Sequence, residues 1–118
     1  MPARDHLPLT VPVYQILLSL VSDDFHGYAI IQDIAARTSG EVSLTASTLY
    51  AAIRRLREAD LIEELTDRPD DDSDPRRRYY RITGIGREVV QAEAERLERQ
   101  VMMARDKRLL ASTRTRAS

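Results

Sequence analysis

Residues 44–81 read LTASTLYAAIRRLREADLIEELTDRPDDDSDPRRRYYR, and this stretch decides the fold. Its first part predicts a helix over 45–59, because Thr45 is a good N-cap and apolar residues then recur at helical spacing. Residues 61–66 and 78–83 are rich in β-branched, leucine and tyrosine positions, which predicts an antiparallel pair of strands. A helix followed by a basic β-hairpin indicates a winged helix.

Two more helices are predicted before this stretch. The first, over 10–21, begins with Thr10 as its cap and carries Pro12 in the first turn, where a missing N–H costs nothing. Residues 22–26 read as a turn. Residues 27–38 then show apolar side chains at helical spacing and predict the second helix.

The chain as a whole is predicted to be mainly α with a small β-hairpin (α+β): a winged helix-turn-helix with a long C-terminal helix. We expect a loose N-terminal arm over 1–9 and a winged helix-turn-helix domain over 10–83. A charged helix over 84–110 and a disordered tail over 111–118 complete the chain.

Composition narrows the class of protein. The 118 residues allow one domain, and an apolar fraction of 42% is typical of a globular chain. No apolar run approaches the ~20 residues of a membrane span, and the N-terminus lacks the pattern of a signal peptide. The absence of cysteine excludes disulfides and thiolate chemistry and fits a cytoplasmic setting.

The net charge of −1 argues against indiscriminate nucleic-acid binding, but the distribution of charge is informative. Arginines gather around the motif and aspartates fill the loop between the strands. The arginines are Arg54, Arg55, Arg57, Arg76, Arg77, Arg78 and Arg81, and the aspartates are Asp67, Asp70, Asp71, Asp72 and Asp74.

The helix over 45–59 has two unlike faces. At 100° per residue, Leu49, Ile53 and their neighbours share an apolar face, while the opposite face combines small, hydroxyl and arginine side chains. Small residues allow close approach to a groove, hydroxyls bond phosphates, and an arginine can fork onto a guanine edge or a phosphate. An ordinary solvated helix face is the alternative.

Arg76, Arg77 and Arg78 lead into the tyrosines of the second strand. Strand alternation places Tyr80 toward the core and Arg81 outward. Outward arginines on a wing can lie along a phosphate backbone. Alternatively, they neutralise the aspartates of their own loop.

Other chemistry finds little support. The acidic loop resembles a calcium site, but Pro75 stands where that motif needs glycine and Arg81 where it needs glutamate. His6 and His26 are isolated, and no catalytic triad spacing, glycine-rich phosphate loop or metal-ligand cluster occurs. We therefore expect no enzyme, no metal and no cofactor.

The C-terminal helix carries a narrow apolar stripe between charged flanks. Part of the stripe is expected to pack on its own chain and part to form a two-fold contact with a second copy. The residues expected at that contact are Ile85, Val89, Leu97, Val101 and Ala104.

With these residues in place, the chain resembles the PadR family of transcriptional regulators, in its short form with one C-terminal helix. The matching pieces are HGYAII at 26–31, TLYAAIRRL at 48–56, ADLIE at 59–63 and RRRYYRIT with GxG at 76–86. The resemblance implies a winged helix-turn-helix and a homodimer joined through the C-terminal helix, with help from the N-terminal one. It also implies a repressor-like role at a pseudo-palindromic promoter site.

The resemblance places the DNA-contacting helix at 45–56 and the wing at 67–78. The residues expected to bind double-stranded DNA are Thr45, Ser47, Thr48, Tyr50, Ala51, Arg54, Arg55, Arg76, Arg77 and Arg78. Family members often carry prolines where this chain has Ala46 and Ala51, so this helix is expected to be more regular. Some relatives bind flat aromatic effectors between tryptophans at the dimer interface. The absence of tryptophan here puts that mode of effector binding in doubt.

Two functions remain open on the sequence. The favoured one is a sequence-specific, dimeric DNA-binding regulator. The other is a winged-helix module that binds a protein partner, which the near-neutral charge and the acidic loop keep in play. Salt dependence separates them, because contacts with several phosphates make DNA binding strongly salt-sensitive.

Overall fold

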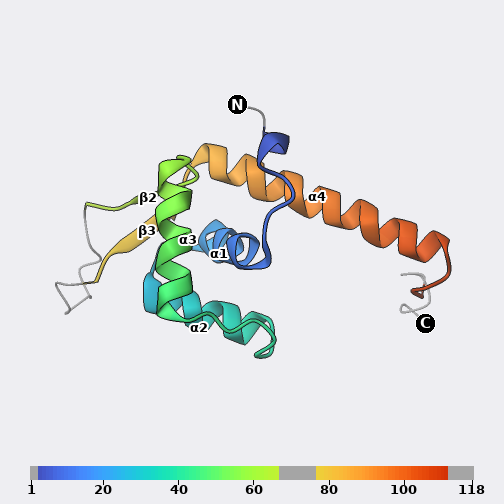
Figure 1. Cartoon of the computed structure of the whole chain (residues 1–118), viewed down its shortest axis with the longest axis horizontal. Helices are drawn as coiled ribbons and strands as arrows, with labels where there is room; N and C mark the ends of the chain where they lie inside the picture. The colour runs from blue at the N-terminus through green and yellow to red at the C-terminus, as the bar shows by residue number, and fades with distance from the viewer. Residues whose placement is uncertain (1–2, 67–76, 112–118) are drawn as a thin grey trace.

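Four α-helices and a small sheet make up the fold of this computed structural model, which describes residues 3–66 and 77–111 (Figure 1). In chain order the elements are η1 (Ala3–His6), α1 (Val11–Ser22), β1 (Phe25–His26), α2 (Gly27–Arg37), α3 (Ala46–Glu58), β2 (Ile62–Glu64), β3 (Tyr79–Ile82) and α4 (Gly84–Asp106). The predicted α+β class and all four predicted helices are confirmed.

Side-chain caps set where each α-helix begins. The hydroxyls of Thr10, Thr45 and Thr83 accept the third backbone N–H of α1, α3 and α4, over 3.4, 3.1 and 3.0 Å. At α2, His26 Nδ1 accepts the N–H of Ala29 over 3.2 Å. Each cap satisfies an N–H that has no partner inside its own helix, so these local sequence signals fix the boundaries.

The sheet has three antiparallel strands in the order β1-β3-β2. The predicted pairing of β2 with β3 is confirmed, with Ile62 opposite Ile82. The predicted turn over 22–26 is partly wrong, because its last two residues form β1 and pair with the other edge of β3. A two-residue strand has no periodicity of its own, so only its partner reveals it.

A single core lies between the sheet and the helices. Ile16 and Leu17 of α1, Ile34 of α2 and Leu49 of α3 are fully buried in it. Tyr80 is also buried and Arg81 is exposed, which confirms the predicted alternation along β3. The first half of α4 closes this core.

One residue expected at the dimer contact belongs to that core instead. The Val89 side chain is 0% exposed and packs with the other core residues, so it has no surface to offer a second copy. Ile85 is exposed, Leu97 and Ala104 are half-buried, and Val101 is exposed. The stripe thus divides, as expected, between packing on its own chain and an outward part.

The N-terminal arm is not loose over its described part. η1 packs against α4, and Figure 1 shows it beside that helix, with the segment that follows η1 running across α4. The backbone N–H of Leu9 donates to Glu93 Oε2 over 3.0 Å, and Arg96 donates two hydrogen bonds to the same carboxylate. The Glu93 residue is 1% exposed, so this buried acceptor ties the arm to α4. Residues 1–2 lie outside the described part of the chain.

Beyond the core, α4 continues past the rest of the molecule (Figure 1). Its far end exposes apolar side chains: Val101, Met102 and Met103 on the helix, then Leu109 and Leu110 beyond it. Within the described residues, no helix is long and apolar enough to cross a membrane.

The junction between the sheet and α4 depends on one glycine. A Cβ placed on Gly86 would lie 2.1 Å from the carbonyl oxygen of Leu61, and the same oxygen accepts the N–H of Thr83 over 3.0 Å. The Thr83 hydroxyl also donates to the carbonyl of Asp60 over 2.6 Å. Because the obstructing atom belongs to the backbone, a side chain at position 86 cannot be relieved by a rotamer change.

Gly86→Ala should therefore destabilise the protein by about 3 kcal/mol, the upper end of the usual cost of overpacking. Gly84→Ala is the matched control, because it lies two residues away with no atom within 4 Å of an added Cβ. The control should be neutral or stabilising by about 0.4–1 kcal/mol. Urea unfolding of both variants at one protein concentration measures the change in stability. Equal unfolding midpoints would show that the close approach at Gly86 does not limit stability.

The buried Glu93 carboxylate also predicts how stability depends on pH. Hydrogen bonds from Arg96, aided by the Leu9 N–H, lower its pKa although burial acts the other way. A carboxyl whose pKa is lower in the folded state stabilises the protein above its unfolded pKa of about 4.3, and that contribution is lost as pH falls through the folded pKa. The temperature of thermal unfolding should therefore fall below about pH 4.

Glu93→Gln should flatten this acid dependence, whereas Glu98→Gln, an exposed change on the same helix, should not. An acid transition that is identical in the wild-type protein and Glu93→Gln would show that the carboxylate is not a stabilising ion.

Candidate nucleic-acid interface

α3 presents the predicted two faces. Leu49, Ile53 and Leu56 are buried in the core, and the side chains of Ser47 and Arg54 are exposed on the opposite face. Tertiary packing therefore orients the helix as its pattern predicts. The exposed face is small and polar near the start of α3 and carries both Arg54 and Glu58 near its end.

Tyr50 lies on the flank of α3 that packs on α2. It is 46% exposed, and a Cβ added to Gly27 would lie 2.4 Å from its hydroxyl oxygen. The tyrosine thus rests on the first turn of α2, in space left by the glycine. The quoted HGY segment supplies this glycine, but the contact itself depends on the packing of two helices.

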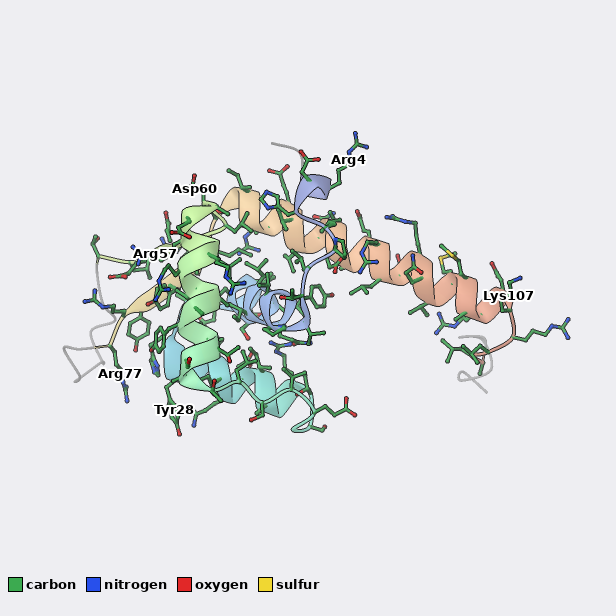
Figure 2. All side chains as sticks on the ribbon, viewed as in Figure 1. Arg4, Tyr28, Arg57, Asp60, Arg77 and Lys107 are labelled. Atoms are coloured by element: carbon green, nitrogen blue, oxygen red, sulfur yellow. The ribbon has the colours of Figure 1, made fainter. Side chains whose placement is uncertain are left out.

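The same flank of α3 also faces the sheet, where its arginine forms an ion pair with an acidic residue. Arg57, which Figure 2 shows on the side of α3 toward β2 and β3, pairs with Glu64 of β2 over 3.2 Å. Arg78, the residue before β3, pairs with the other oxygen of Glu64 over 2.8 Å. One carboxylate therefore neutralises an arginine from α3 and an arginine from the wing.

Arg81, which points outward from β3, also forms an ion pair with an acidic residue. Its guanidinium donates to both oxygens of Asp24, over 3.0 and 3.4 Å, and this pair raises the pKa of Arg81. Sequence reasoning missed Glu64 and Asp24 as partners, because each pair joins two different elements that only the fold brings together. The expected contacts between wing arginines and the loop aspartates, like Arg76 itself, lie outside the described residues.

The opposite flank of α3 faces the beginning of α1 and is hollowed. Thr10, Pro12 and Val13 form one wall of this hollow, and Thr48, Ala51 and Arg55 form the other. No acidic residue lines it. Across residues 3–66 and 77–111, no carboxylate lies within ion-pair distance of Arg54 or Arg55.

The two threonines at the start of α3 are linked. Thr45 accepts the Thr48 N–H as the cap and donates its own hydroxyl proton to Thr48 Oγ1 over 3.0 Å. This arrangement leaves the Thr48 hydroxyl proton free to donate elsewhere. Both side chains remain exposed.

A polar cluster fixes α1 against α2 behind this surface. Arg37 donates to Asp33, to the Ser19 hydroxyl and to both the side chain and the carbonyl of Gln15, over 2.7–3.0 Å. Ser19 is 2% exposed and donates to Asp33 as well. Burial raises the pKa of Asp33, but the hydrogen bonds from Arg37 and Ser19 outweigh it and leave the pKa lowered. The spacing of Asp33 and Arg37, four residues apart on one helix, is the sequence signal for this cluster.

No group of three or more His, Asp or Glu side chains that could hold a metal ion occurs among the described residues. His26 serves as a helix cap and lies edge-on to Tyr79, with ring centroids 5.3 Å apart. The loop that resembles a calcium site lies outside the part of the chain that the structure describes.

Comparison with known proteins identifies a family. The model of the transcriptional regulator PadR-like family matches residues 14–92, which span α1 to the first half of α4. An uncharacterized protein of Lysinibacillus sphaericus is 36% identical over 72 residues, which are 61% of this chain and 64% of that protein. The chain thus spans less than two thirds of that relative.

Solved structures share the fold. A transcriptional regulator from Clostridium thermocellum superposes with a TM-score of 0.68 at 27% identity, covering 80% of this chain and 87% of that one. PadR of Bacillus subtilis, solved in complex with operator DNA, gives a TM-score of 0.60 at 22% identity over 76% of this chain and 48% of that one.

Proposed function

The chain belongs to the PadR-like family of transcriptional regulators, and from this we propose that it represses transcription as a homodimer on a pseudo-palindromic promoter site. The observation that carries the proposal is the outward face of α3, where Arg54 and Arg55 have no acidic partner among the described residues. In this role the protein acts on double-stranded DNA in the cytoplasm.

The dimensions of α3 support a position in the major groove. An α-helix with its side chains is about 10–12 Å across, and the groove is about 12 Å wide. Ser47 and Ala51 keep the first turns slim, so the backbone can approach the bases closely. Arg54 lies on the same face and can reach a guanine edge with two parallel N–H donors.

The far half of α4 supports the homodimer. Val101, Met102 and Met103 are exposed on a helix that projects beyond the core, and Leu97 and Ala104 are half-buried beside them. Covering this surface with a second copy removes apolar area from water, which favours association by ~25 cal/mol per Å². Ile85, on the first turn of α4, remains a further candidate contact. Any small-molecule effector would sit at this interface without tryptophan to stack on.

Arg54→Ala should weaken binding to the operator by about 1–3 kcal/mol, the worth of a bidentate base contact, with little change in stability. The operator comes from selecting duplexes out of a random library with the wild-type protein. Fluorescence anisotropy against salt then gives the affinity and its slope. Wild-type affinity that is insensitive to salt would instead favour the protein-binding alternative.

Replacing Leu97 and Val101 together by aspartate should separate the two copies. Each half would then hold half of the contacts, and affinity would fall to the non-specific range, on the order of 10⁻⁴–10⁻⁶ M. Sedimentation follows the change in mass, and Gln100→Glu serves as an exposed control on the same helix. A double variant that remains dimeric and protects both half-sites would show that the dimer contact lies elsewhere on the protein.

A further inference from the structure

The three arginines of α3 point in three directions. Successive residues turn by 100°, so Arg55 lies 100° from Arg54 on one side, and Arg57 lies 60° from it on the other. The contacts agree with this geometry: Arg57 meets Glu64 of the sheet, and Arg55 lines the hollow beside α1. Arg54 lies between them, on the outward face.

A helix that enters the major groove meets different parts of the duplex in these directions. Side chains at its leading face reach base edges on the floor, whereas side chains turned about 90° away meet the phosphate strands that form the walls. One wall would lie beside the sheet and the wing. The other would lie beside the hollow that α1 and α3 share.

The chemistry of the hollow suits a phosphate. Arg55 contributes a planar fork of donors, which matches two phosphate oxygens. Thr48 contributes a hydroxyl whose proton is free, because Thr45 donates to its oxygen. Ala51 keeps the space between them open, and no carboxylate lines the hollow to repel an anion.

We infer that Arg55 and Thr48 hold a DNA backbone phosphate in the hollow between α1 and α3, on the strand opposite the wing. This inference rests on the proposed DNA binding, and it gives Arg54 and Arg55 of α3 different roles. Arg55 positions the helix on any duplex, and Arg54 distinguishes one sequence from another. On the side of the sheet, Glu64 already pairs with Arg57 and Arg78, whereas Arg55 in the hollow has no carboxylate partner among the described residues.

The test measures affinity against salt for the selected operator and for a random duplex of equal length. The proteins are the wild type, Arg54→Ala, Arg55→Ala, Arg55→Lys and Thr48→Val, with Arg99→Ala on α4 as an exposed control. Circular dichroism and thermal unfolding confirm that each variant is folded, as exposed positions lead us to expect.

Arg55→Ala should weaken binding to both duplexes by the same factor. It should also reduce the salt slope by about 0.9 per protomer, or about 1.8 for a dimer, because one phosphate contact is lost from each copy. Arg55→Lys keeps the charge and should preserve the slope. Thr48→Val should weaken both duplexes more mildly, and Arg54→Ala should affect the operator alone.

Two results would overturn the inference while leaving the proposed function intact. One is a loss of operator affinity in Arg55→Ala with no change for the random duplex, which would make Arg55 a reader of bases. The other is unchanged binding to both duplexes, which would show that the hollow does not touch DNA. A wild-type protein that binds no duplex would instead overturn the proposed function, and the inference with it.

Discussion

The close approach of α4 to the start of β2 is the constraint on which the other parts of the molecule depend. Only a residue without a side chain lets the first turn of α4 pass under the Leu61 carbonyl, and that carbonyl also holds Thr83. The junction fixes the direction in which α4 leaves the sheet. Since β2 follows α3 directly, it also fixes α4 relative to the exposed face of α3. In the proposed dimer joined through α4, this contact would be one of the determinants of the spacing between the two α3 helices.

The charges of this chain act through local pairing rather than through the net value. Glu64 holds Arg57 and Arg78, Asp24 holds Arg81, and Glu93 holds Arg96. The pairs of Glu64 and Asp24 are exposed and contribute little to stability, but they remove positive charge from the surfaces where they lie. Within the described residues, the arginines at positions 54 and 55 differ from these because no carboxylate approaches them. A protein of nearly zero net charge can therefore present a cationic surface at one place.

The elements behind α3 hold that surface in position. Arg37 binds α1 to α2 through groups of both helices, and Tyr50 rests on α2 in the space that Gly27 leaves. Both contacts are made where the helices cross, away from the outward face of α3. The orientation of Arg54 and Arg55 thus depends on packing that neither residue takes part in.

The sequence alone determined the elements whose causes are local. Thr10, Thr45 and Thr83 cap helices through hydroxyls three residues from the N–H groups they accept, and the apolar spacing on α3 selects the buried face without reference to any other element. The outward position of Arg81 follows from strand alternation in the same way, and the pairing of β2 with β3 follows from two β-rich segments close together in the chain.

Tertiary structure decided what depends on residues far apart in the chain. The arm is ordered because Leu9 meets Glu93, 84 residues later, and Arg81 is neutralised by Asp24, 57 residues earlier. The strand β1 exists only because β3 lies beside it, and Val89 belongs to the core because α4 folds back along α1. The periodicity of apolar residues along the chain does not predict these contacts, because each one forms only when burial of the core brings two distant segments together.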